Sequence, residues 1–436
     1  MKGATIRKLE KGVFSPRKEG KCEEVTKIPT REEFFRNYVS ASRPVIFKGA
    51  AAKWAASSKW TNEYLKEEAG DRQVHVKITP DGEFEGCDAA SNWEDHATRV
   101  LPERVSSKLS FPDLVVVRPA PHDLPFDEFM HIIETRRDIN AYMEYASLSS
   151  YLPSLAEDVE VPPFARNLLA QAHFNIWLGN GRTLGKLHFD PFDNLLAQVA
   201  GEKHFTIFPP SQSQNLYEGH IPEAQFDFDF ETGEFKKKTL FESTSMVMSP
   251  VDLKKPNFER FPLFYEATPL QCRVAQGDVI FLPSFWWHEV QSVPDAASRN
   301  IAVNYWFDPF FTKDFPCAAC HLKVSEKYYG LLDLLEAAVP KDTEEPVPII
   351  PQEVVDAEKT PKVSKEDAPV VNKPKEEPVA KEETIGKEKS KGTKPAEKGE
   401  KASKDSKGGK DSKGVKEKQK EKGKDKDKAP RVSDEL

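Results

Sequence analysis

Residues 187–190 read Leu-His-Phe-Asp, and residues 286–288, much further along the chain, read Trp-Trp-His. Side chains two apart on an extended strand point to the same face, so His188 and Asp190 can meet one metal ion. His288 can supply a third ligand if its strand lies alongside. Two histidines and one carboxylate with open positions form the ligand set of non-haem Fe(II) oxygenases. The three residues are therefore predicted to be both metal ligands and catalytic residues.

The sequence around this triad has the pattern of an antiparallel β domain. Residues 188–210 read as a strand, a turn at Gly201 and a second strand that stops at Pro-Pro, and residues 276–288 read as a turn and a strand. Such strands recur from Phe174 to Phe307, which predicts a mainly β barrel or sandwich with flanking helices. Because a His-x-Asp motif often arises by chance, the triad could also consist of ordinary barrel residues.

These segments resemble the Jumonji-C (JmjC) family of 2-oxoglutarate oxygenases, and within it a branch of lysyl hydroxylases with an ascribed peptidase activity. The resemblance runs from roughly Pro29 to Leu335 and includes residues 42–50 and 175–179. It implies a double-stranded β-helix, the jelly-roll form of the cupins. It also implies a protein hydroxylase that uses Fe(II), O2 and 2-oxoglutarate as cosubstrate. No H-E-x-x-H zinc motif or nucleophile–base pair supports the peptidase activity.

The resemblance also assigns residues to the cosubstrate. Lys203 and Tyr142 match the family residues that bind the distal carboxylate of 2-oxoglutarate, as a charge-assisted pair and a hydrogen bond. Asn194 and Asn304 match positions near the cosubstrate and the metal ligands. The alternatives are that Lys203 is a surface lysine after a Gly-Glu turn, and that the two asparagines bond to backbone at strand ends.

Two positions depart from the family pattern. The family commonly has Thr or Ser three residues before the first metal-binding histidine, where this chain has Gly185. Thr183 is the candidate substitute at a different register. Leu196 stands where close relatives carry tyrosine. We therefore expect an altered cosubstrate pocket, and a different keto acid stays open.

Composition divides the chain into a folded body and a tail. Residues 341–436 contain no aromatic residue and carry 25 Lys+Arg against 23 Asp+Glu, which leaves 38 basic and 48 acidic residues in the rest. Such a tail cannot bury enough apolar surface to offset its chain entropy. We expect an N-terminal arm over residues 1–28, a JmjC domain over residues 29–340 and a disordered tail. The acidic body disfavours nucleic acid as its ligand.

Two further segments have alternative interpretations. Residues 328–339 predict an apolar helix, which either packs on the core or forms a homodimer, as helices of this kind often do in the resembling family. The long insert between Tyr217 and Gln271 is aromatic enough to be ordered. It is predicted to contact substrate, with simple covering of the strands as the alternative.

Cysteine usage and targeting signals bear on the compartment. Five cysteines form an odd, sparse set, which favours a reducing compartment over a disulfide framework. Residues 317–321 match a haem-attachment pattern, but no export signal accompanies it. No signal peptide or membrane-spanning run is visible, so no membrane association is expected. A cytoplasmic and/or nuclear protein is expected. The endoplasmic reticulum is less favoured, although residues 433–436 read Ser-Asp-Glu-Leu.

The substrate follows from the resemblance alone. The branch implies hydroxylation of a lysine in a developmentally regulated GTP-binding protein. A lysine target needs a negative site for its ammonium group, and Asp193, Asp227 and Asp229 are candidates that could equally be solvated loop charges. The alternatives are a JmjC oxygenase that acts on tRNA or another residue type, and a non-catalytic cupin-like scaffold.

Overall fold

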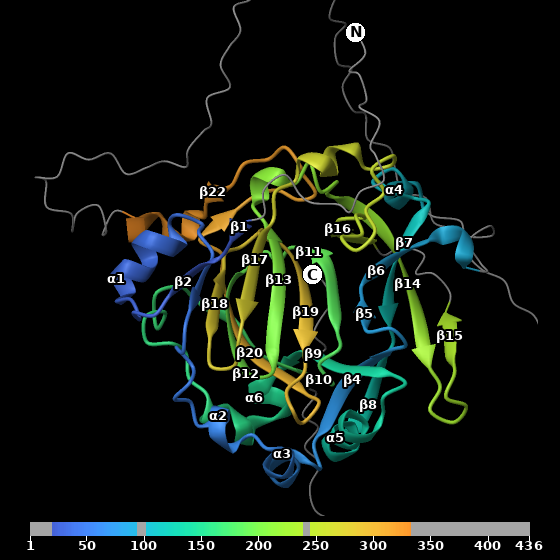
Figure 1. Cartoon of the computed structure of the whole chain (residues 1–436). Coiled ribbons are helices and arrows are strands. Elements are labelled where there is room, and N and C mark those ends of the chain that lie inside the picture. Colours follow the sequence, from blue (N-terminus) through green and yellow to red (C-terminus); the bar gives the residue numbers. More distant parts are fainter. Residues whose placement is uncertain (1–19, 94–101, 239–244, 333–436) are drawn as a thin grey trace, which may run out of the picture. The chain divides into compact units, whose positions relative to one another are not determined.

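Two facing β-sheets form the core of the chain, a double-stranded β-helix (Figure 1). The computed structural model describes residues 20–93, 102–238 and 245–332. The six-stranded sheet has, in order, β1 (Gly20–Lys21), β17 (Leu270–Val274), β13 (Glu202–Phe208), β19 (Trp287–Val293), β11 (Leu184–His188) and β5 (Glu83–Phe84). The nine-stranded sheet has, in order, β2 (Glu23–Val25), β3 (Val45–Phe47), β18 (Val279–Leu282), β12 (Asp193–Ala200), β20 (Asn300–Phe307), β10 (Gln171–Gly179), β9 (Asn140–Ser147), β4 (Gln73–Thr79) and β8 (Pro121–Pro125). The predicted fold class is confirmed.

The central strands of the nine-stranded sheet are buried on both faces. All eight residues of β20 are buried, and so are all eight of β12. Alternate residues such as Ile301 and Val303 belong to a large outer core, whereas Ala302 belongs to a smaller core between the sheets. A strand covered on both sides reads as a continuous apolar run, as this one does.

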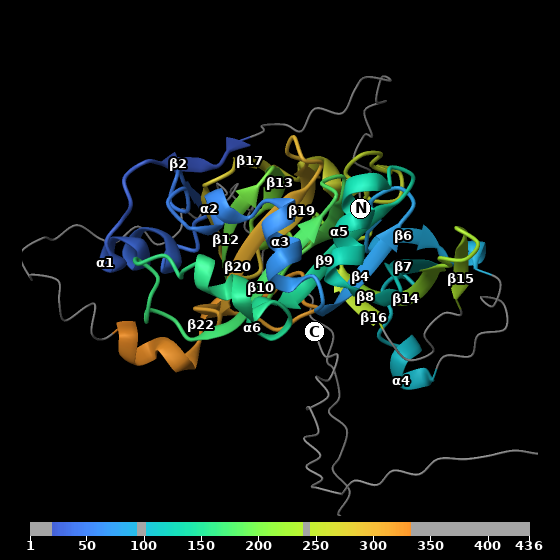
Figure 2. The same ribbon diagram turned by 90° about the horizontal axis from the view of Figure 1, so that it is seen from below.

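Helices cover the outer face of the nine-stranded sheet (Figure 2). They are α1 (Arg31–Phe34) with the π-helical turn η1 (Phe35–Val39), α2 (Ala56–Lys59), α3 (Asn62–Ala69), α5 (Phe126–Thr135), α6 (Leu148–Tyr151) and the 3-10 turn η3 (Pro153–Asp158). Thr30 and Glu33 form a capping box at the start of α1. The helices α2 and α3 are separate because Thr61 is extended and caps α3 by accepting a hydrogen bond from the Tyr64 amide.

The long insert builds much of a third sheet with an earlier part of the chain. Its strands run in the order β15 (Phe235–Lys238), β14 (Gly219–Phe228), β7 (Leu114–Pro119) and β6 (Gly86–Ala89), and β16 (Ser245–Met248) also pairs with β14. Smaller elements are η2 (Ala90–Asn92), α4 (Glu103–Ser106), η4 (Pro210–Gln212) and η5 (Pro262–Glu266). The ordering expected from the aromatic content of the insert is therefore present in its described residues.

The expectation that the cysteines stay unpaired was wrong. Cys22 is bonded to Cys272, and Cys317 is bonded to Cys320, while Cys87 is free. Composition could not show the first pair, because it depends on β1 lying parallel to β17 across 250 residues of sequence. The end of the predicted N-terminal arm thus joins both sheets, through β1 and β2. The compartment itself stays a prediction.

The described chain ends shortly after the core. After β20 come β21 (Phe311–Thr312), β22 (Lys323–Val324) and the 3-10 turn η6 (Glu326–Tyr328), followed by helical residues to Leu332. Most of the predicted helix over residues 328–339, and the whole tail from residue 341, lie outside the described residues. No helix in the described ranges is long and apolar enough to cross a membrane.

Candidate active site

The register of two neighbouring strands brings the predicted metal ligands together. His188 on β11 lies directly opposite His288 on β19, and their ring centroids are 4.3 Å apart. A bulge in β11 between Gly185 and His188 sets this register. Asp190 lies two residues beyond His188, just past the strand end, where its carbonyl accepts a hydrogen bond from the Phe285 amide. The three side chains therefore converge from the ends of two adjacent strands.

Hydrogen bonds fix both imidazoles in the orientation of metal ligands. Nδ1 of His188 lies 2.6 Å from the Lys186 carbonyl oxygen, and Nδ1 of His288 lies 2.9 Å from the Trp286 carbonyl oxygen. A carbonyl can only accept, so each Nδ1 carries the proton and each Nε2 presents a lone pair. The two Nε2 atoms lie 4.0 and 3.5 Å from the carboxylate oxygens of Asp190.

This donor set fits a divalent metal ion with open coordination positions. The ligand atoms of His188, Asp190 and His288 lie within 4.8 Å of one another. Among the described residues, these three form a group that could hold a metal ion. Burial alone would raise the pKa of Asp190, but the neighbouring His288 and His188 lower it below its usual range. The carboxylate is therefore available as a ligand. Three protein ligands leave room for a bidentate cosubstrate and one further small ligand.

Deeper in the barrel, a buried lysine lies among hydroxyl groups. Lys203 is 3% exposed, and its Nζ donates to Ser292 Oγ at 2.9 Å and to Tyr142 Oη at 3.3 Å. Thr183 Oγ1 lies 2.9 Å from the same serine oxygen. No carboxylate of the described chain forms an ion pair with this ammonium, and burial lowers its pKa to about 7. The surface-lysine alternative is excluded, and the group suits an anionic ligand.

Tyr142 reaches this cluster because a glycine lies beside it. Gly179 on β10 pairs with Tyr142 on β9, and a Cβ at Gly179 would lie 2.8 Å from the tyrosine ring. The ring packs against Phe84, at 5.3 Å between centroids, and lies 5.5 Å from Lys203 Nζ. The residue predicted from the family pattern is thus held in place by the backbone of the neighbouring strand.

The two predicted asparagines belong to one side-chain network between the sheets. Asn304 donates to Asn194 at 3.1 Å and accepts from the Trp177 indole at 2.8 Å and from Asn175 at 3.3 Å. Asn304 is fully buried and lies opposite Leu196 on β12. Asn194 and Asn304 therefore bond to side chains, and the alternative of backbone bonding at strand ends is wrong.

Sequence reasoning missed Ser292. It lies opposite Lys203 on β19 and contacts both Lys203 and Thr183. The available signal was strand parity, because Ser292 follows His288 by four residues and residues an even number apart share one face. Serine is common enough in strands that this spacing alone did not single it out.

The predicted aspartates do not line this site. Asp193 accepts from the Ser284 and Phe310 amides, which makes it a structural residue, although burial raises its pKa to about 6. Asp229 caps a turn and pairs with Lys236. Asp227 pairs with His122 at 3.2 Å. Local sequence could not reveal these partners, since Ser284, Phe310 and His122 come from distant segments.

Carboxylates nearer the metal strand line a separate small cleft. Its volume is about 70 Å³, and its polar lining includes Glu83, Glu85, Asp252 and Lys186. Lys186 lies 3.0 Å from Asp252 and 3.7 Å from Glu83. Lys186 is therefore occupied by these carboxylates and does not join the Lys203 cluster.

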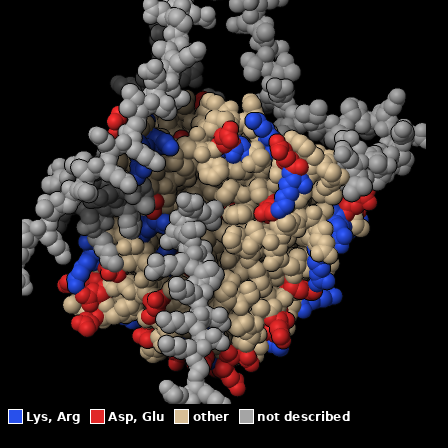
Figure 3. Space-filling view, turned by 180° about the vertical axis from the view of Figure 1, so that it is seen from behind, with Lys and Arg blue, Asp and Glu red and all other residues tan. Residues whose placement is uncertain are grey.

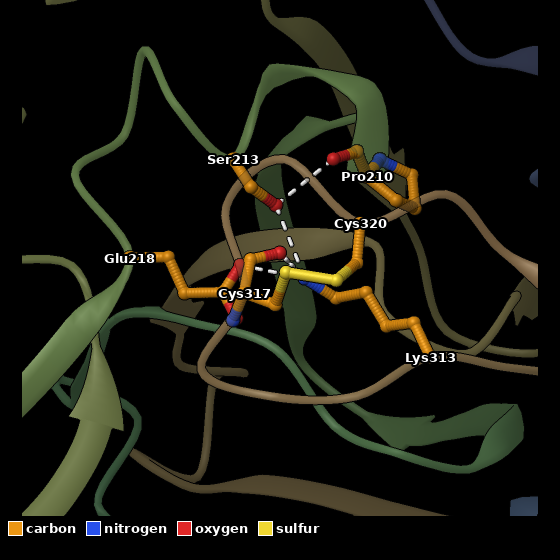
Figure 4. The surroundings of a disulfide bond; sticks show 6 residues. All are labelled: Pro210, Ser213, Glu218, Lys313, Cys317 and Cys320. Carbon is orange, nitrogen blue, oxygen red and sulfur yellow. Dashed lines mark hydrogen bonds and ion pairs between the residues drawn. A yellow bond between two sulfur atoms is a disulfide. The ribbon is translucent and has the colours of Figure 1, made fainter. Parts of the chain in front are cut away.

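Figure 4 shows the surroundings of the second disulfide, which joins Cys317 and Cys320. Glu218 and Lys313 form a fully buried ion pair of 2.6 Å, which holds the backbone N–H and carbonyl of Cys317. Nζ of Lys313 also lies 5.3 Å from the ring of Phe189, the residue between the first two metal ligands. Because Cys317 is bonded to Cys320, its sulfur is not available for haem attachment.

The fold and this site define a cupin-type metal-dependent oxygenase. Residues 31–313 match the model of the cupin-like domain family. The chain is 31% identical over 320 residues to the human bifunctional peptidase and (3S)-lysyl hydroxylase JMJD7, covering 72% of this chain and 88% of that protein. It therefore belongs to the cupin-like JmjC family and is an enzyme of the 2-oxoglutarate-dependent dioxygenase class.

Other relatives carry different substrate names. The lysine-specific demethylase JMJ32 of Arabidopsis thaliana is 30% identical over 298 residues, which cover 65% of this chain and 80% of that protein. The tRNA wybutosine-synthesizing protein 5 of Gallus gallus is 27% identical over 282 residues, which cover 62% of this chain and 74% of that protein. Similarity therefore shows the family and its oxygenase chemistry, and it leaves the substrate undecided.

Proposed function

We propose that this chain is an Fe(II)- and 2-oxoglutarate-dependent protein hydroxylase whose target is a lysine side chain. The observation that carries the proposal is the pairing of two sites on adjacent strands. The open His188, Asp190 and His288 triad lies on the same barrel face as the buried Lys203. His288 and Ser292 are four positions apart on β19, which is roughly 13 Å of strand. An elongated keto dicarboxylate bridges such a pair of sites.

The chain's own residues bind and orient the reactants. His188, Asp190 and His288 would hold Fe(II), with both imidazoles already fixed by backbone carbonyls. Lys203, assisted by Tyr142, would hold the distal carboxylate of 2-oxoglutarate. Bound there, Fe(II) would supply the oxidative chemistry of this class, in which 2-oxoglutarate and O2 give succinate and CO2 and one oxygen atom enters a substrate C–H bond.

For the substrate, we infer a lysine of a translation-associated GTP-binding protein. Similarity to a (3S)-lysyl hydroxylase over most of the chain supports the residue type. Glu83 and Asp252 of the cleft beside β11 already pair with Lys186, so they offer no separate support for a cationic side chain. A lysine target would need a negative site that holds its ammonium group away from the metal and presents a carbon atom to it.

Nucleic acid is the less favoured substrate, although one relative is a tRNA-modifying protein. The chain outside the tail carries more acidic than basic residues. On the face shown in Figure 3, the visible lysines and arginines alternate with acidic residues around a broad uncharged area. A phosphate backbone calls for a continuous basic surface instead.

The test combines cosubstrate turnover with product mass. Full-length protein is incubated with Fe(II), 2-oxoglutarate and lysine-containing peptides from GTP-binding proteins. We expect succinate release together with a single +16 Da modification on lysine. A modification that persists when that lysine is replaced by arginine, or that occurs only on RNA, would overturn the substrate assignment.

A further inference from the structure

An interior position between the metal site and Lys203 carries no side chain. On β19, His288, Val290 and Ser292 face the barrel interior, opposite Ile207, Phe205 and Lys203 of β13. On the other side of β19, Gly185 of β11 lies opposite Val290. A Cβ built at Gly185 meets no atom within 4 Å. Space for a side chain is therefore open in the wall between the two ends of the site.

This glycine is not required by the backbone. Gly185 does not adopt a positive φ, unlike Gly201 at the following hairpin turn. A Cβ at Gly179 would lie 2.8 Å from the Ala141 carbonyl oxygen, whereas a Cβ at Gly185 has free space. An L residue would fit here without strain. What the glycine provides is room inside the pocket.

The hydroxyl groups near Lys203 lie at the far side of this space. Ser292 Oγ bridges Lys203 Nζ and Thr183 Oγ1, with both distances 2.9 Å. Thr183 and Ser292 are both nine-tenths buried or more, and so is Lys203. Thr183 precedes Gly185 by two residues. It therefore lies roughly 6.6 Å further from His188 than Gly185 does, measured along the strand. A carboxylate bound by Lys203, Ser292 and Thr183 can therefore lie further from the metal ligands than a carboxylate bound beside Gly185.

We propose that the pocket accepts a 2-keto dicarboxylic acid one carbon longer than 2-oxoglutarate, namely 2-oxoadipate, as an alternative cosubstrate. The extra methylene occupies the space at Gly185, and the distal carboxylate is received by Lys203, Ser292 and Thr183. This inference rests on the proposed function and concerns the same site.

The chemistry balances as it does for the shorter acid. The C1–C2 bond of 2-oxoadipate breaks and C1 leaves as CO2. One atom of O2 enters the new carboxylate, giving glutarate, and the other enters the C–H bond of the substrate. The keto acid and the C–H bond each supply two of the four electrons that reduce O2.

Calorimetric binding to Mn(II)-loaded full-length protein tests this without turnover. We expect a Kd for 2-oxoadipate within about threefold of that for 2-oxoglutarate. Gly185→Thr should fill the space and weaken 2-oxoadipate binding about tenfold or more, with a smaller change for 2-oxoglutarate. Gly330→Thr is the matched control, because a Cβ there also meets nothing within 4 Å and the residue is exposed. Gly185→Ala is the second variant if the threonine disturbs folding.

The outcomes separate this inference from the proposed function. If 2-oxoglutarate binds tightly but the Kd of 2-oxoadipate is more than about tenfold higher, the inference is overturned and the proposed function stands. Binding of neither acid would overturn the function itself. If the ratio of the two Kd values is the same in Gly185→Thr as in the unmodified protein, Gly185 does not determine which keto acid binds. Mass detection of glutarate in reactions with Fe(II) gives an independent second readout.

Discussion

Lys203 is the residue on which the proposed cosubstrate binding depends most directly. Removing a charge-assisted hydrogen bond costs roughly 1.5–3 kcal/mol. Lys203→Ala should therefore weaken 2-oxoglutarate binding about ten- to a hundredfold, with little effect on metal binding. Lys186→Ala is the matched control, because that lysine is also buried but already paired with Asp252 and Glu83. Titration of both variants with 2-oxoglutarate measures the difference, and an unchanged affinity in Lys203→Ala would contradict the assignment.

The same residue predicts a pH dependence. Burial lowers the pKa of Lys203 to about 7, so without a ligand the amine loses its proton as pH rises through 7. A carboxylate favours the charged form, and binding at pH 8 should therefore take up a proton. Affinity for 2-oxoglutarate should fall above about pH 7. Calorimetry in buffers of different ionisation enthalpy measures the uptake, and Lys203→Met should show none. Affinity that stays constant from pH 7 to 9 would contradict this prediction.

The same pKa bears on stability without ligand. The unfolded chain, with an ordinary lysine pKa, binds more protons than the folded one between pH 7 and about 10.5. The burial cost of the charged lysine is thus fully present below pH 7 and is relieved as pH rises through that window. Urea unfolding of the unmodified protein and Lys203→Met at pH 7 and 9 measures this. The stability gained by the methionine should be smaller at pH 9.

At the scale of strands, the three predicted ligands do lie close together, but for a partly different reason from the one that the spacing suggested. The spacing of His188 and Asp190 suggested one strand face, but β11 ends at His188 and Asp190 follows it. The bulge between Gly185 and His188, which places His188 opposite His288, depends on pairing with β19, and the sequence of β11 does not contain that information. Ser292 was missed because serine is common in strands, so its even spacing from His288 did not single it out. The strands themselves were predictable because apolar alternation is local.

The disulfides give a prediction at this scale. In the chain-entropy view, a cross-link over 250 residues stabilises by about 5 kcal/mol and one over a few residues by about 2 kcal/mol. Replacing Cys22 and Cys272 with serine should therefore destabilise the protein more than replacing Cys317 and Cys320. Urea unfolding of the two double variants compares them under oxidising conditions. Equal stability of the Cys22/Cys272 variant and the unmodified protein would show that this bond contributes nothing.

At the scale of the whole molecule, composition predicts an independent body. Residues 341–436 lack aromatic residues, and the described core closes without them. Deletion after Lys341 should leave the melting temperature and peptide turnover nearly unchanged. Thermal unfolding of the truncated and full-length proteins checks this, and a fall of more than a few degrees would show that the tail packs on the body.

The central claim is that His188, Asp190 and His288 hold the iron of a 2-oxoglutarate oxygenase. The most direct measurement is succinate release at limiting Fe(II), in the unmodified protein and in Asp190→Ala. Loss of one of three ligands should reduce turnover about a hundredfold or more while circular dichroism shows the fold retained. Iron-dependent succinate release in the unmodified protein that nearly vanishes in the variant is the predicted result. Full activity in Asp190→Ala would contradict the account.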